Sequence, residues 1–127
     1  MKWLVLAGLS LVFIPLHVQA MPTAVLFENC SSTKEDEDGA AALTSCLTYL
    51  RGYLDYVNVA SSLEPNSDQL VCLPANVGLE QVRLMFLKFM EARPEILHLD
   101  SAFILRKVLV DGFSVCGARP SLESFEN

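Results

Sequence analysis

The chain has 127 residues with 15 acidic and 9 basic side chains, which gives a formal net charge of −6 at pH 7. An acidic surface repels nucleic acid and anionic lipid and favours a basic protein partner. The length is enough for one modest domain.

Residues 1–20 have the features of a secretory signal peptide. Lys2 supplies a positive start, residues 3–16 are apolar, and Val18-Gln19-Ala20 offers the small-residue pattern of a cleavage site. The apolar run is shorter than the roughly 20 residues that span a bilayer, although a retained membrane anchor is the alternative. Cleavage after Ala20 leaves 107 residues, and the loss of Lys2 takes the net charge from −6 to −7. We therefore expect an exported domain.

Two helices are predicted in the first half of that domain. Residues 23–30 give about two helical turns, and the acidic run 34–38 is expected to be solvated and to favour the N-terminus of the next helix. Residues 40–61 form the clearest helix, because their apolar side chains share one broad face: Leu43, Cys46, Tyr49, Leu50, Tyr53, Leu54, Val57 and Ala60.

Two features of this long helix have more than one interpretation. Tyr49, Tyr53 and Tyr56 are spaced as an aromatic binding box would be, but the same spacing more often places rings in the core with their hydroxyls at the rim. Gly52 costs about 1 kcal/mol in a helix interior relative to alanine. It therefore suggests that another backbone approaches closely at this point.

Residues 62–71 form the main loop, since Pro65, Asn66, Ser67 and Asp68 have strong turn chemistry. A helical hairpin follows, with helices over residues 79–92 and 101–113 separated by a break at residues 93–95. Gly78 and Asp100 stand at the two N-cap positions. Residues 117–127 lack periodicity and are expected to form a flexible tail after a single domain over residues 21–116.

Three side chains of the hairpin stand out. Leu84 and Leu87 fall on the polar side of their helix. One interpretation is that they are isolated surface leucines or are covered by the acidic segment. The other is that they form a self-association or partner-binding patch. Arg106 projects close to the apolar side of the last helix, so it must reach water or find a carboxylate.

The four cysteines all follow the signal and indicate two disulfides, with three possible connectivities. Both ends of the domain need tying down, and the long helix needs tying to the loop that returns from it. We therefore expect a nested pattern, with Cys30 bonded to Cys116 and Cys46 bonded to Cys72.

The sequence offers no catalytic constellation. His98 is the one histidine left after signal cleavage, and it lies between two leucines at a helix–helix turn, where it more often packs or caps a carbonyl. A Cys-His nucleophile would need a free thiol. Zinc-ligand spacings, a phosphate-binding loop and a nucleophile elbow are all missing from the sequence. We therefore predict a non-enzyme with no cofactor and no metal.

A set of short motifs follows in order along the chain: Cys46-x-x-Tyr49-Leu50-x-Gly52-x-x-Asp55, Cys72-Leu73-Pro74, Gln81, Arg93-Pro94-Glu95-x-Leu97-His98, Ala102 and Cys116. Together these motifs resemble the Rap/Tai family of periplasmic immunity proteins against type VI secretion amidases. The likeness covers about residues 30–116. The resemblance implies an all-α, disulfide-linked bundle of about four helices that often dimerises. It also implies that the protein blocks the active-site cleft of a peptidoglycan amidase.

The leading hypothesis is therefore a periplasmic protein that neutralises a cell-wall-degrading toxin. We predict that Glu64, Asn66, Ser67 and Asp68 contact the toxin, against the alternative of an ordinary solvated turn, and that Leu84 and Leu87 mediate self-association. The main alternative is a periplasmic acid-stress chaperone or envelope assembly factor, because small acidic helical proteins can bind unfolded clients when low pH opens them. An enzyme is the third and weakest interpretation.

Overall fold

The structure is a computed structural model that describes residues 20–117, and this part of the chain consists of helices and loops. The elements are α1 (Thr23–Ser31), α2 (Glu37–Leu63), α3 (Leu79–Glu91), the 3-10 helix η1 (Pro94–Ile96) and α4 (Ser101–Phe113). The predicted all-α class is confirmed, and each predicted helix has its counterpart. The predicted signal peptide, except Ala20, and the predicted tail beyond Gly117 lie outside the described residues.

The acidic run begins α2 three residues earlier than expected. Asp36 is the N-cap residue, and its Oδ1 accepts a hydrogen bond from the Gly39 N–H at 2.6 Å. Glu37 and Asp38 then occupy the first turn, where their charge is favourable against the positive end of the helix dipole. Local helix stabilisation therefore accounts for these carboxylates.

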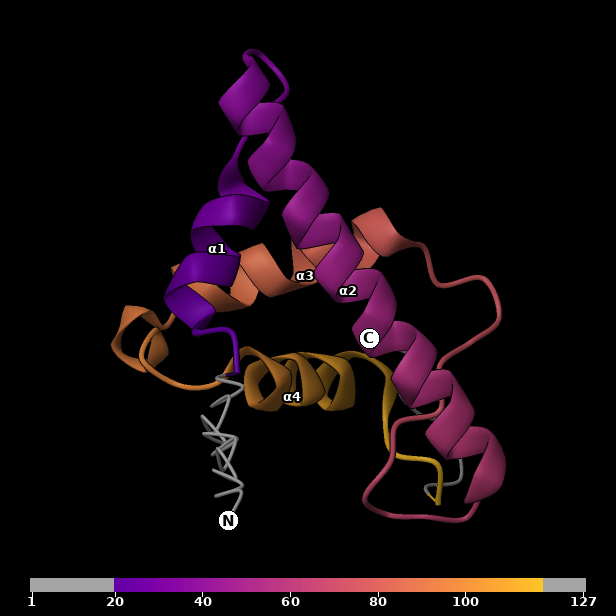
Figure 1. Ribbon diagram of the computed structural model, residues 1–127. Helices are drawn as coiled ribbons and strands as arrows, with labels where there is room; N and C mark the ends of the chain where they lie inside the picture. Colours follow the sequence, from indigo (N-terminus) through magenta and orange to yellow (C-terminus); the bar gives the residue numbers. More distant parts are fainter. Residues whose placement is uncertain (1–19, 118–127) are drawn as a thin grey trace, which may run out of the picture.

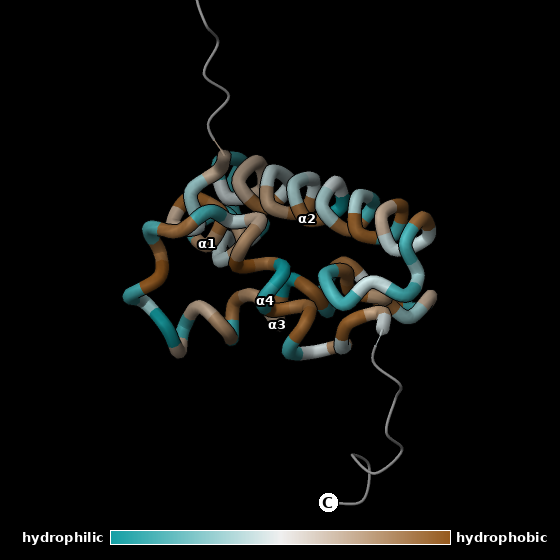
Figure 2. Tube along the Cα trace, turned by 90° about the horizontal axis from the view of Figure 1, so that it is seen from below, coloured by the Kyte–Doolittle hydropathy of each residue, from teal (hydrophilic) through white to brown (hydrophobic). Residues whose placement is uncertain are grey.

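The long helix α2 forms one side of the molecule. Figure 1 shows α1 beside the first half of α2, α3 crossing behind α2 near its middle, and α4 below α3. Figure 2 shows α2 running along one edge with the other helices on the opposite side. All four α-helices contribute to one core, whose largest fully buried side chains include Leu26, Leu50, Phe86, Ile104 and Leu105. Within the described residues, no helix combines the length and apolar character needed to span a membrane.

The segment before α1 pairs with the segment before α4. Pro22 and Asp100 form an antiparallel bridge, and the Thr23 N–H and hydroxyl both donate to the Leu99 carbonyl, at 3.0 and 2.6 Å. Ser101 in turn donates from its N–H and its hydroxyl to the Met21 carbonyl, at 3.1 and 2.7 Å. Asp100 is the N-cap residue of α4 as predicted, but its side chain makes no capping bond. These bonds satisfy helix N–H groups that would otherwise lack partners.

The predicted nested disulfide pattern is wrong. The bonds are Cys30–Cys46, here called the N-terminal disulfide, and Cys72–Cys116, the C-terminal disulfide, with Cα–Cα distances of 5.1 and 4.7 Å. A connection of only five residues, 32–36, folds α1 back against α2, so both cysteines of the N-terminal disulfide reach the same interface and are fully buried. The C-terminal disulfide joins the two cysteines that bracket the α3–α4 hairpin.

Cys72 does not return to Cys46 because the loop after α2 would have to be almost fully extended to bring it back. Seventeen residues separate Cys46 from the end of α2 at Leu63, which is about 26 Å at 1.5 Å per residue. The loop spends part of its length in a turn, and Val71 then pairs with Val115 in an antiparallel bridge. That bridge places Cys72 beside Cys116.

The predicted close approach at Gly52 is also wrong. Gly52 is exposed, and a Cβ built on it would meet nothing within 4 Å. Gly112 in α4 has a close neighbour instead, since a Cβ there would lie 2.2 Å from Cε of Met85, the end of a side chain of α3.

Candidate functional site

The residues predicted to contact a partner lie in the turn segment, defined here as residues 64–70, which leaves the end of α2. Glu64 is the C-cap residue of α2, and its N–H donates to the Ala60 carbonyl at 3.1 Å. The Ser67 N–H then donates to the Glu64 carbonyl at 3.1 Å, which closes a turn. Glu64, Asn66 and Asp68 are exposed, and Ser67 is partly buried. The segment therefore presents two carboxylates and an amide to solvent.

The C-terminal segment fixes the backbone of this turn segment. The Cys116 N–H donates to the Leu70 carbonyl at 2.8 Å, and the Gly117 N–H donates to the Ser67 carbonyl at 3.3 Å. The C-terminal disulfide and the Val71–Val115 bridge follow directly along the chain. The turn segment is thus held along one side by chain that arrives from the end of α4.

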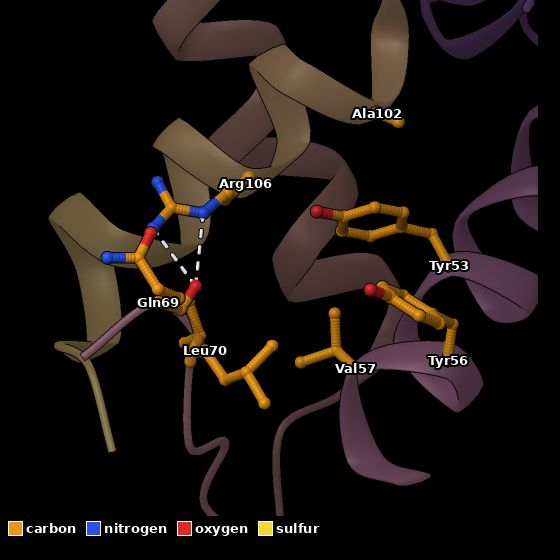
Figure 3. A pocket seen from close by; sticks show the side chains of 8 residues that line it. Tyr53, Tyr56, Val57, Gln69, Leu70, Ala102 and Arg106 are labelled. Atoms are coloured by element: carbon orange, nitrogen blue, oxygen red, sulfur yellow. Dashed lines mark hydrogen bonds between the residues drawn. The ribbon is translucent and has the colours of Figure 1, made fainter. Parts of the chain in front are cut away.

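Arg106 of α4 fixes the turn segment from another direction. Its Nε and Nη2 both donate to the carbonyl of Gln69, at 3.2 and 3.0 Å. From the sequence, Arg106 was expected to reach water or a carboxylate. In the structure, its side chain contacts a backbone carbonyl instead. The dashed lines in Figure 3 mark these two bonds. Arg106 therefore connects α4 to the part of the chain that carries the predicted contact residues.

A groove of about 360 Å³ lies between α2, α4 and the turn segment, and we call it the α2–α4 groove. Figure 3 shows the hydroxyls of Tyr53 and Tyr56 pointing from α2 across the groove towards the side where Arg106 lies. The eight residues that line it are Tyr53, Tyr56, Val57, Gln69, Leu70, Val71, Ala102 and Arg106. The walls are mostly apolar, while the phenols, the guanidinium and one amide supply the polar groups.

The tyrosines differ from one another in burial, so the prediction of three core rings is only partly right. Tyr49 and Tyr53 are partly buried against the core, whereas Tyr56 is 60% exposed. The rings of Tyr53 and Tyr56 lie 6.2 Å apart between centroids. Burial, together with repulsion from Tyr56, raises the pKa of Tyr53 to about 12 even though the Arg106 charge opposes the shift. Tyr53 is therefore a neutral hydroxyl at physiological pH.

The other singled-out residues lie away from this groove lining. Leu84 is 53% exposed on α3, while Leu87 is only partly exposed and packs against the core, so the two leucines do not form an equally open pair. His98 is exposed in the segment before α4. The sequence singled out Arg106 and the tyrosines separately, but it did not predict the groove that brings them together. The one feature of the sequence that pointed to this groove was the position of Arg106 near an apolar helix face.

A comparison with protein families places the fold and this site in context. The family model for Rap1a immunity proteins matches residues 23–115, which is most of the described chain and includes α1 to α4, the turn segment and the groove. No curated protein and no solved structure matches the chain. The resemblance seen in the sequence motifs is thereby confirmed, and the chain belongs to the Rap1a family of immunity proteins, which protect against a secreted effector.

Proposed function

We propose that this protein resides in the periplasm and inhibits a peptidoglycan amidase delivered by a type VI secretion system. Membership of the immunity family supports a protein effector as the partner. The motif resemblance supports the amidase class. An inhibitor that fills an active-site cleft needs shape and charge rather than catalytic groups of its own.

The observation that carries the proposal is the turn segment: exposed polar side chains on a backbone that is already fixed. Glu64, Asn66 and Asp68 point to solvent, while the backbone is held at Ser67, Gln69 and Leu70 by hydrogen bonds from α4 and the C-terminal segment. A segment ordered before binding loses less conformational entropy when it enters a cleft. The amidase surface that receives it is expected to carry basic groups, because the segment presents two carboxylates.

Charge reversal in the turn segment tests this proposal. The amidase is first recovered by pull-down with the oxidised protein from cells that express its neighbouring genes. Glu64→Lys with Asp68→Lys is then expected to weaken inhibition at least about tenfold, as expected when at least one charge-assisted contact is lost. The melting temperature should stay unchanged, because both side chains are exposed.

Glu35→Lys is the matched control for this experiment. Glu35 is also exposed, and it lies just before α2, at the opposite end of that 27-residue helix from the turn segment, about 40 Å away at 1.5 Å per residue. It should leave inhibition intact. Equal inhibition by the double variant and the control would exclude the turn segment as the inhibitory surface, and failure to recover any amidase would count against the amidase itself.

The proposal includes self-association through α3. Leu84 is exposed, and an apolar side chain on the polar face of a helix is a common feature of subunit contacts. Leu87 contributes less, since it is partly covered by the protein's own core. A dimer formed there would leave the turn segment free for the effector.

A further inference from the structure

Arg106 is a cation that has no carboxylate partner in the described part of the chain. The ion pairs found there are Glu80–Arg83 and Lys107–Asp111. Both hydrogen bonds of Arg106 go to the neutral carbonyl of Gln69. A guanidinium has five N–H donors, so those two bonds leave three donors available. Although the chain has 15 acidic residues, the Arg106 guanidinium is paired with none of those in the described part.

The α2–α4 groove surrounds this cation with groups that suit an anion on an apolar stem. None of its lining residues is acidic, and Val57, Leu70, Val71 and Ala102 supply apolar contacts. The hydroxyls of Tyr53 and Tyr56 point towards the Arg106 side in Figure 3. Phenol and guanidinium N–H and O–H groups donate to carboxylate oxygens, and such charge-assisted bonds are about twice as strong as neutral ones.

We propose that the α2–α4 groove binds a carboxylate carried by an apolar segment of the protein partner. The carboxylate contacts the free donors of Arg106 and the Tyr56 hydroxyl, and the apolar part of the segment packs on Val57 and Leu70. This inference deepens the proposed function, since the partner is the effector of the previous section, but the binding site itself is tested without any effector.

The surroundings of the groove favour a protein segment as its occupant. Tyrosine and arginine are among the residues enriched at the energetic centres of protein interfaces, and both line this groove. The two helices that bound it also carry three other large exposed apolar side chains, Val59 and Leu63 on α2 and Phe103 on α4. The turn segment adjoins the groove through Gln69 and Leu70. One partner can therefore present basic groups to the turn segment and a carboxylate to the groove.

The charges of the two areas then act as a specificity filter. A partner with basic groups alone would satisfy Glu64 and Asp68 but would place no anion against Arg106. A partner that presented acidic groups to the turn segment and a basic group to the groove would meet like charge at both places. Like charges brought together across an interface are unfavourable, so the filter rejects such partners.

The test is a titration of the isotopically labelled, oxidised protein, followed by NMR. The probe is N-acetyl-L-leucine, which joins a carboxylate to an apolar side chain, and the control ligand is N-acetyl-L-leucinamide, which has the same apolar group without the charge. The carboxylate is expected to shift the Arg106 Nε–H signal and the backbone signals of Tyr56 and Leu70, and to bind at least about tenfold more tightly than the amide.

Two variants and a control separate recognition from structure. Arg106→Gln should abolish the difference between the acid and the amide, but it also removes the bonds to Gln69. Tyr56→Phe removes a hydroxyl from an exposed side chain with no hydrogen bond to the turn segment, and it should weaken binding of the acid severalfold without changing the melting temperature. Arg51→Gln removes a positive charge from an exposed position on α2 outside the groove lining and should change nothing.

Several outcomes would overturn the proposal. Equal affinity for the acid and the amide would show an apolar groove without anion recognition, and signal changes confined to other surfaces would place binding elsewhere. If Arg106→Glu converts a dimer to a monomer in analytical ultracentrifugation, the groove is occupied by a second copy rather than by a different protein. A failure to recover an amidase would leave the acid-over-amide preference in place and would count against the proposed function alone.

Discussion

Replacing Gly52 with alanine should stabilise the protein. Gly52 is exposed within α2, and an alanine Cβ would meet no other atom within 4 Å, so the substitution removes no contact and creates no clash. Glycine in a helix interior costs about 1 kcal/mol relative to alanine, because the glycine backbone loses more freedom on folding. The free energy of unfolding should therefore rise by about 1 kcal/mol. With an unfolding entropy of about 2 cal/mol/K per residue, the melting temperature of a domain near 100 residues rises by about 5 °C.

Gly39→Ala is the control with the opposite sign. Gly39 also lies in α2, but its Cβ would stand 2.4 Å from the carbonyl oxygen of Thr33 and 3.1 Å from Oδ1 of Asp36. A backbone oxygen cannot move aside as the end of a flexible side chain can, so the substitution should lower stability by about 1–3 kcal/mol. Urea and thermal unfolding of the oxidised proteins, followed by circular dichroism at several protein concentrations, measures both changes.

A loss of stability in the Gly52→Ala variant would refute the reasoning. If that loss grows with protein concentration, this face of α2 is covered by another copy of the chain. If it does not, the cost of a helical glycine has been misjudged for this site.

Three further predictions concern the two disulfides, the pKa of Tyr53 and self-association through α3. Cys72 is exposed and the N-terminal disulfide is fully buried, so limited reduction should open the C-terminal disulfide first, as detected by alkylation and mass spectrometry. Inhibition should then be lost while the helical content remains. Simultaneous opening of both disulfides would contradict this order. The pKa of Tyr53 is raised to about 12, so folding favours the neutral hydroxyl. The contribution of this hydroxyl to the free energy of unfolding should be complete below pH 10 and disappear as the pH rises from 10 to 12. Tyr53→Phe should flatten that part of the plot of stability against pH. Leu84→Glu should shift any dimer towards monomer in analytical ultracentrifugation, whereas Phe103→Glu, at a similarly exposed position on α4, should not.

The helices could be predicted because each is set by its own local sequence. The apolar spacing that defines α4 gave residues 101–113 from the sequence, and the structure has Ser101–Phe113. Breaks at Pro94 and at the Pro65 turn are equally local, since proline acts on its immediate neighbours. The start of α2 shifted because a side-chain cap at Asp36 outweighed the apolar pattern as a boundary signal.

The disulfides and the groove could not be predicted in the same way, because they depend on where whole helices lie. The long reach of α2 and the tight α1–α2 connection decided the pairing, and neither follows from cysteine spacing. Arg106 was visible as an unplaced cation, yet its partner is a backbone carbonyl of Gln69, and the sequence does not mark individual carbonyls. The turn segment was predicted from its turn chemistry, while its anchoring by Cys116 and Gly117 required tertiary structure.

The two disulfides serve different parts of the molecule, and this division bears on the proposed recognition of the effector. The N-terminal disulfide lies in the core between α1 and α2, where it stabilises the bundle whatever the surface carries. The C-terminal disulfide fixes chain that holds the turn segment and one side of the α2–α4 groove. Exposed side chains at Glu64, Asn66 and Asp68 can therefore change without disturbing the core, because none of them packs into it. A surface that is fixed in shape but free in side-chain identity is what a protein needs if it must match one effector closely and reject others.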